Sequence, residues 1–196
     1  MSAMERDWYR FSEMFPDVNL DRYSKEEAMK IILQRFAYRN VIFDEEMIKS
    51  FYKFPAKDIK NAIAVMLEEK IIIKYEEGYI LKEDLEKLNN TNIQMPSKVY
   101  AMHRNDFLIK SNEHWLKNLY SHENHDTLYY LLIDGQIKGI VVGKFRFTPT
   151  IEDIIVDLTA DDVKLRKKEI IQAVRNLCGP DAQIKRYNGE SSDSLI

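Results

Sequence analysis

The stretch DIKNAIAVMLEEKIIIKYEEGYIL, residues 58–81, combines a helical pattern with a β-hairpin pattern. In its first half the apolar residues recur at helical spacing and predict one buried helix face: Ile59, Ala62, Ile63, Met66 and Leu67. Two β-rich runs follow at residues 71–75 and 79–81, and we expect Gly78 to supply the positive φ of their turn. The stretch therefore predicts a helix followed by a hairpin with Glu76 and Glu77 at its tip.

Signals upstream of this stretch predict two more helices and a short strand. Ser24 and Glu27 form the S-x-x-E capping box that opens a helix. Residues 41–43, Val-Ile-Phe, predict a stub of strand, and Asp44 is suited to cap a second helix. Pro55 fits the first turn of the third helix, which continues into residues 58–81.

The resulting order is helix, strand, helix, helix, hairpin, and it resembles the winged helix-turn-helix superfamily over residues 22–88. The resemblance rests on the rhythm of the third helix, its charged exit at residues 68–70 and the Gly78-Tyr79 step in the hairpin. It implies that the third helix is the recognition helix and that the hairpin is the wing. Because winged helices also serve as protein-docking modules, DNA binding and protein docking both stay open.

The second half predicts an α+β domain with a mainly antiparallel sheet. VYAMHRNDFLIK, residues 99–110, predicts a strand, and Ser111 is suited to cap a short helix after it. The strongest hairpin signal is LYYLLIDGQIKGIVVGKFRF, residues 128–147, with its turn at Asp134-Gly135. The remaining predicted elements are a strand at 151–158, one amphipathic helix at 161–178 and a strand at 183–187.

The predicted domain organisation is an N-terminal winged helix and a C-terminal α+β domain. The stretch NNTNIQMPSK, residues 89–98, is rich in Asn and lacks periodicity, so it predicts a linker. The units are a winged-helix domain with an aromatic N-terminal extension at 1–88, the linker at 89–98, the α+β domain at 99–190 and a polar tail at 191–196.

Composition and charge bound the function. Residues 1–90 carry 15 Lys and Arg against 18 Asp and Glu, and residues 91–196 carry 14 against 14, so neither half has a basic excess. Any contact with nucleic acid must therefore come from a local basic patch. The apolar runs are too short to span a bilayer, and a single cysteine fits a reducing compartment, so we expect a cytoplasmic protein without a membrane partner.

The predicted DNA-binding site is the exposed face of the third helix, with one residue from the turn before it and one from the second helix. Lys and Asn side chains suit phosphates and base edges. The candidate residues are Lys49, Lys53, Lys57, Lys60 and Asn61. The role that follows is a DNA-binding protein, for example a transcriptional regulator whose second domain senses a ligand or mediates assembly.

The acidic tip of the predicted wing leaves two alternatives open. Two carboxylates within a Debye length of about 10 Å repel phosphates. Either the wing stands away from DNA, or the winged helix docks on protein as a non-enzymatic module of a larger complex. Lys74 and Lys82 flank the tip and partly offset Glu76 and Glu77.

Two further resemblances concern the second half. The Asp134-Gly135 hairpin, strand and long helix look like part of an N-acetyltransferase fold, which implies a pyrophosphate at the helix start. Here that place reads LTADDVKLRKK, where the absence of glycine and the charges of Asp161 and Asp162 oppose a pyrophosphate. The layout of residues 104–143 is similar to the C-terminal part of the winged-helix DNA glycosylases, but that family's catalytic motif has no counterpart here.

Other candidate residues point to ordinary structural roles. His114, His122 and His125 have nitrogen ligands for a divalent metal, but the spacing is as typical of surface histidines, so we assign no metal and no cofactor. Cys178 lies at the end of a helix, where the dipole disfavours a thiolate. No catalytic motif is assigned, and enzymatic activity stays open.

The N-terminal segment MERDWYRFSEMFPDV, residues 4–18, is rich in aromatic residues that need a place to be buried. One prediction is a helix that packs on the rest of the chain. The other is a contact in a homodimer or with a protein partner, because such residues are enriched at interface cores.

Overall fold

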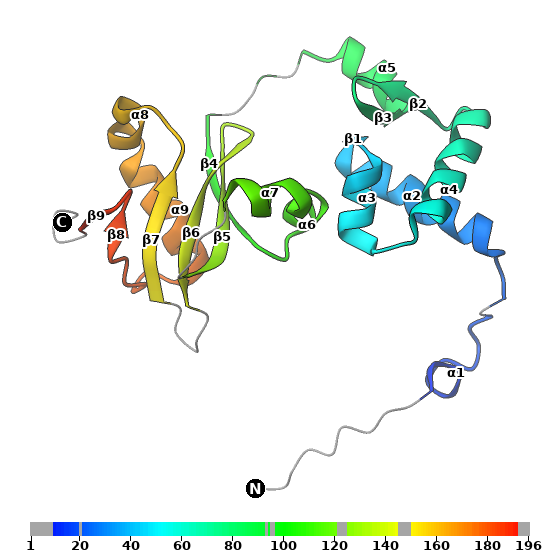
Figure 1. The fold of residues 1–196 in the computed structure, drawn as a ribbon, viewed down its shortest axis with the longest axis horizontal. Coiled ribbons are helices and arrows are strands. Elements are labelled where there is room, and N and C mark those ends of the chain that lie inside the picture. The colour runs from blue at the N-terminus through cyan, green and yellow to red at the C-terminus, as the bar shows by residue number, and fades with distance from the viewer. Residues whose placement is uncertain are drawn as a thin grey trace, which may run out of the picture.

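The structure, a computed structural model, describes residues 10–19, 21–92, 94, 97–120, 125–144 and 150–191. It is a mixed α+β architecture with largely antiparallel sheets, as predicted. Figure 1 shows two lobes, which we call the N-terminal lobe (residues 25–90) and the C-terminal lobe (residues 99–191). No helix in the described part of the chain is long and apolar enough to cross a membrane.

The N-terminal lobe consists of helices around a small sheet. Its elements, with a short preceding helix α1 (Phe11–Met14), are α2 (Lys25–Asn40), β1 (Ile42–Phe43), α3 (Glu45–Tyr52), α4 (Ala56–Glu68), β2 (Ile72–Tyr75), β3 (Gly78–Leu81) and α5 (Lys82–Asn90). The described strands of this lobe are antiparallel and lie in the order β1-β3-β2. Their core is formed by Leu33, Phe36, Phe43, Ile48, Ile59, Met66 and Ile72.

The predicted helix starts in this lobe are confirmed. The Ser24 hydroxyl accepts the Glu27 N–H at 3.2 Å, and the Ser24 N–H donates to the Glu27 carboxylate at 2.8 Å, so the capping box opens α2. Asp44 accepts the Met47 N–H at 2.7 Å at the start of α3, and Pro55 caps α4. Polar caps therefore set the starts of α2 and α3, and a proline, which makes no side-chain cap hydrogen bond, sets the start of α4.

The prediction for Gly78 is wrong in its reason. The positive φ of the β2–β3 turn belongs to Glu76, at 48°, and Gly78 does not have one. A Cβ at Gly78 would lie 2.5 Å from the carbonyl oxygen of Phe43 on the neighbouring strand β1. Glycine is required there because two backbones approach closely, not because of the turn.

The C-terminal lobe is built on a sheet covered on both faces. Its elements are β4 (Val99–His103), α6 (Phe107–Ser111), α7 (Glu113–Leu119), β5 (Asp126–Ile133), β6 (Gln136–Lys144), β7 (Thr150–Val156), α8 (Ala160–Leu165), α9 (Lys167–Cys178), β8 (Arg186–Tyr187) and β9 (Glu190–Ser191). The described strands follow this order across the sheet, and only the β7–β8 pair among them is parallel. The Asp134-Gly135 turn is confirmed, with φ values of 50° and 78°.

Two clusters of apolar side chains separate the layers of this lobe. Ile170 and Val174 of α9 pack on one face of the sheet, with Leu131 and Val141 among their neighbours. On the other face, α6 and α7 cover Tyr130, Ile140 and Val142. Because helices cover both faces, the central residues of β5 and β6, 128–131 and 139–143, are buried without alternation.

Residues 107–111 form a helix, not the predicted end of a strand. Asp106 accepts the Leu108 N–H at 2.9 Å and starts α6 there. Ser111 does not cap the next helix, because it is buried as the last residue of α6 and donates to the Phe107 carbonyl at 2.9 Å. A short apolar run such as FLIK does not distinguish strand from helix by itself.

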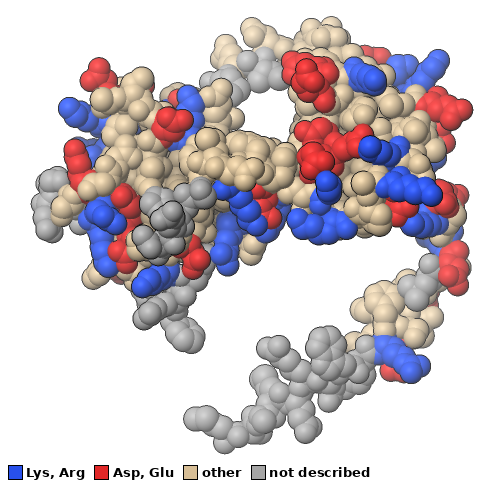
Figure 2. Space-filling model, viewed as in Figure 1, with Lys and Arg blue, Asp and Glu red and all other residues tan. Residues whose placement is uncertain are grey.

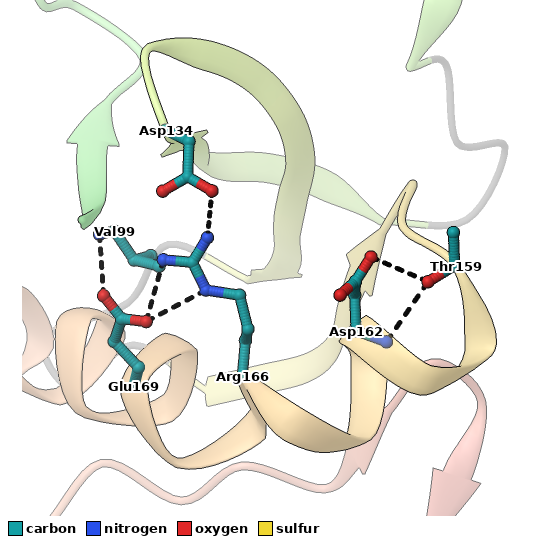
Figure 3. Close-up of polar contacts among 6 residues, drawn as sticks. All are labelled: Val99, Asp134, Thr159, Asp162, Arg166 and Glu169. Carbon is teal, nitrogen blue, oxygen red and sulfur yellow. Dashed lines mark hydrogen bonds and ion pairs between the residues drawn. The ribbon is translucent and has the colours of Figure 1, made fainter. Parts of the chain in front are cut away.

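The single helix predicted over residues 161–178 is two helices that meet at Arg166. Leu165, predicted to be apolar core, is 81% exposed at this break. The Arg166 guanidinium donates to Glu169 at 2.8 Å and also contacts Asp134 of the β5–β6 turn (Figure 3). Glu169 in turn accepts the Val99 N–H at 3.1 Å, so this cluster fastens α9 to β4 and to the hairpin turn.

The two lobes meet where α6 and α7 contact α3. The Phe107 ring from α6 packs against aromatic rings of the N-terminal lobe. Its centroid lies 4.8 Å from that of Phe51 and 5.6 Å from that of Phe36. The buried Ser50 of α3 donates its hydroxyl hydrogen bond to the Lys110 carbonyl at 3.0 Å. The helices α6 and α7 therefore lie between α3 and the large sheet (Figure 1).

The predicted division at residues 89–98 stays a prediction. The helix α5 continues to Asn90, so it includes the first two residues of the predicted linker. Of the predicted tail, Ser191 ends β9 and residues 192–196 lie outside the described residues.

Candidate nucleic-acid interface

The turn between α3 and α4 carries Lys53, one of the predicted lysines. Lys53 ends α3 in the left-handed conformation, with φ of 58°, and its N–H donates to the Lys49 carbonyl. The chain then reverses through Pro55 into α4. Lys53 is exposed at this reversal.

The helix α4 buries one face and exposes the other. Ile59, Ala62, Ile63 and Met66 are buried, as predicted from their spacing. Lys57, Lys60 and Asn61 are exposed on the opposite side. Lys57 and Lys60 are three residues apart and so are neighbours on the helix surface.

The exposed lysines of α4 and of the turn before it differ from the lysines of α2 in whether they pair with a carboxylate. On the side of α4 that faces α2, Lys25 pairs with Asp58 at 2.8 Å and Lys30 pairs with Glu69 at 2.8 Å. Lys53, Lys57 and Lys60, which we call the basic stripe, form no ion pair with any carboxylate of the described residues. Figure 2 shows Lys and Arg side chains over α3 and α4, with Asp and Glu side chains among them.

The five predicted residues lie on α3, in the turn after it and on α4, and three of them line two different hollows. Asn61 lines a groove of about 250 Å³ between α2 and α4. Lys49 and Lys53 line a hollow of about 370 Å³ between α3 and α7, whose other wall includes His114, Lys117 and Asn118. We call it the α3–α7 hollow. Lys49 also pairs with Glu46 at 3.3 Å, and both of these side chains are more than half exposed.

A polar cleft of about 510 Å³ lies next to α7 in the C-terminal lobe and was not predicted. It is lined by Arg104, Asn105, Lys110, Glu113, Lys117, Tyr120, His125, Asp126, Thr127 and Tyr130. Glu113 accepts from Lys110 and from Lys117, each at 3.0 Å. Burial disfavours its ionised form, but these two hydrogen bonds outweigh burial, so the pKa of the Glu113 carboxyl is lowered. Lys117 and Glu113 line both the cleft and the α3–α7 hollow.

The described residues do not assemble a metal site from the predicted histidines. His114 lines the α3–α7 hollow and His125 lines the polar cleft, while His122 lies outside the described residues. Within the described part of the chain, no group of three His, Cys, Asp or Glu side chains is placed to hold a metal ion.

Two other candidate sites have structural explanations. Burial raises the pKa of the Cys178 thiol, against a lesser opposing effect of the Tyr129 hydrogen bond. At the start of α8, Thr159 accepts the Asp162 N–H at 3.2 Å and donates to the Asp162 carboxylate at 2.7 Å (Figure 3). This helix start is therefore capped by its own side chains, where an acetyltransferase would hold a pyrophosphate.

The N-terminal aromatic segment is only partly described. Trp8 and Tyr9 lie outside the described residues. Phe11, Met14 and Phe15 are each at least half exposed.

No protein-family model matches the chain, and neither a curated protein nor a solved structure matches it significantly.

Proposed function

We propose that the protein binds DNA and that residues 22–88 form a winged helix with α4 as the recognition helix and β2–β3 as the wing. The order α2, β1, α3, α4, β2, β3 supports this proposal, and so does the sheet order β1-β3-β2, in which β1 pairs with the second strand of the hairpin. A helix presented at the surface by such a scaffold can enter the major groove of duplex DNA.

The observation that carries the proposal is the basic stripe. Lysines that already have a carboxylate partner attract a phosphate less strongly, because the partner offsets their charge, whereas Lys53, Lys57 and Lys60 have no such partner among the described residues. In the proposal, these three lysines bind phosphates and Asn61 reaches base edges. The biological role that follows is transcription regulation in the cytoplasm.

A specific observation also favours protein docking as a second candidate. Glu76 and Glu77 are exposed at the tip of the wing, and Tyr38 at the end of α2 is 66% exposed, with Val41 and Ile42 exposed close by in sequence. An acidic tip and exposed apolar residues suit a protein surface better than a phosphate backbone.

The test is binding to a random-sequence duplex, measured by fluorescence anisotropy at about 50 mM salt. Lys57→Ala combined with Lys60→Ala is expected to weaken binding of all sequences alike, by on the order of a hundred-fold, because two phosphate contacts are lost. The matched control is Lys82→Ala with Lys87→Ala on α5, which removes the same charge from the same lobe. Because α5 packs on β3 and lies apart from the α3–α4 turn (Figure 1), the control variant should bind like the wild type.

Two results would reject DNA binding through α4. One is equal weakening in both double variants, which would mean that only net charge matters. The other is absence of binding by the wild-type protein at about 20 mM salt, where electrostatic contacts are strongest. The second result would leave protein docking as the function.

A further inference from the structure

We infer that the DNA footprint extends from the basic stripe onto α7 of the C-terminal lobe, with Lys117 as a further phosphate contact. This inference rests on the proposed function. It assigns to the C-terminal lobe a direct part in binding duplex DNA, besides any sensing or assembly.

The first argument is that α7 is held in place beside α3. Phe107 of the preceding helix α6 packs against Phe51 of α3. The Ser50 hydroxyl also donates a hydrogen bond to the Lys110 carbonyl at 3.0 Å. Because both contacts are within or close to the buried cores, the lobes present their surfaces together. A ligand that contacts α3 therefore meets α7 at a fixed position.

The second argument is that lysines from both lobes share one hollow. Lys49 and Lys53 come from α3, and Lys117 comes from α7 across the same hollow. Lys53 also belongs to the basic stripe, so it connects Lys57 and Lys60 to this hollow. Figure 2 shows Lys and Arg side chains near α6 and α7 next to those over α3. Glu46 and Glu113 also line this hollow, so its lysines exceed its carboxylates by one, whereas the chain as a whole carries a net charge of −3.

The third argument concerns how Lys117 is oriented. Its side chain is 67% exposed, whereas that of its partner Glu113 is only 17% exposed. Glu113 is thus the more buried partner, and the Lys117 side chain reaches the surface. Glu113 also accepts from Lys110, so its charge is shared between two lysines. In this arrangement Glu113 is a positioning residue, and Lys117 keeps donor capacity for a phosphate oxygen.

The test compares Lys117→Ala with Lys185→Ala as a matched control. Lys185 makes a very similar ion pair, 2.9 Å from Glu152, with side-chain exposures of 54% and 16%. It lies between β7 and β8 at the far side of the large sheet from α3. Both variants lose one exposed lysine that pairs with a largely buried carboxylate, so the change in net charge is the same in both. Because Glu113 keeps its contact with Lys110, Lys117→Ala should cost no more stability than Lys185→Ala.

The expected result is that Lys117→Ala weakens binding to a duplex of about 20 base pairs by on the order of ten-fold at about 50 mM salt. The slope of log affinity against log salt should fall by about 0.9, the value for one phosphate. Lys185→Ala should leave the affinity and the slope unchanged. If Lys117→Ala binds like the wild type, or if Lys185→Ala weakens binding equally, the footprint does not include α7.

The failure of this inference differs from the failure of the proposed function. Wild-type binding that depends on Lys57 and Lys60 but not on Lys117 would confine the footprint to the N-terminal lobe. Absence of wild-type binding to the same duplex at about 20 mM salt would reject both proposals together.

Discussion

At the scale of single residues, buried polar groups tie the helices of the C-terminal lobe to its sheet. Tyr187 of β8 is 2% exposed, and its hydroxyl donates to the Val163 carbonyl of α8 at 3.1 Å. The Lys167 ammonium lies 5.5 Å from the centroid of its ring. Burial raises the pKa of the Tyr187 phenol to about 12, from an ordinary value of 10.0.

This pKa has a consequence for stability at high pH. Below pH 10 the phenol is neutral in the folded and unfolded states. Between about pH 10 and 12 the unfolded state loses the proton first, so stability falls as the pH rises. Tyr187→Phe should cost about 1 kcal/mol at pH 7, because the Val163 carbonyl loses its donor. The difference in the free energy of unfolding between Tyr187→Phe and the wild type should then shrink above pH 10.

Urea unfolding at pH 7 and at about pH 11 measures both effects, and Tyr38→Phe is the control because Tyr38 is 66% exposed. If the free energies of unfolding of Tyr187→Phe and the wild type differ by the same amount at both pH values, the burial assigned to the Tyr187 phenol is wrong.

At the scale of elements, the β2–β3 hairpin, the proposed wing, is the part whose chemistry fits DNA least. Its tip exposes Glu76 and Glu77. If the wing stands away from the backbone, Glu76→Gln with Glu77→Gln should change the affinity for duplex DNA by less than two-fold at about 50 mM salt. Fold stability should stay within about 0.5 kcal/mol, because both positions are at the surface. Tighter binding that fades with added salt would show that the wing lies near the phosphates.

The elements that the sequence predicted well are those set by local chemistry. Ser24, Asp44, Pro55 and the Asp134-Gly135 turn act on their own neighbours, so their effect can be seen in a few residues. The break at Arg166 and the need for Gly78 depend on Asp134 and Phe43, which are distant in sequence. Those features could not be predicted from local patterns.

At the scale of the whole molecule, the two lobes are joined through α6. Phe107 follows the predicted linker in sequence, yet it packs in the core of the N-terminal lobe. The candidate site likewise could be predicted only where its residues are close together in the sequence. The basic stripe could be predicted because it lies on one turn and one helix, whereas the α3–α7 hollow brings together Lys49 and Lys117 from distant parts of the chain.

We predict that Phe107→Ala uncouples the lobes. Loss of the ring should destabilise the protein by about 2–4 kcal/mol, because contacts with Phe36 and Phe51 are lost. After proteolysis within residues 89–98, the wild-type fragments should co-elute on gel filtration and those of the variant should separate. The control is Phe11→Ala, whose side chain is 53% exposed. Co-elution of the Phe107→Ala fragments would show that other contacts hold the lobes together.

The salt dependence of wild-type binding to a random-sequence duplex tests the central claim most directly. Each neutralised phosphate contributes about 0.9 to the slope of log Kd against log salt. Contacts from Lys53, Lys57, Lys60 and Lys117 therefore predict a slope of about 3 to 4 between about 50 and 200 mM salt. A Kd that does not change over this range, or no binding at its lower end, would contradict the assignment of these lysines to DNA.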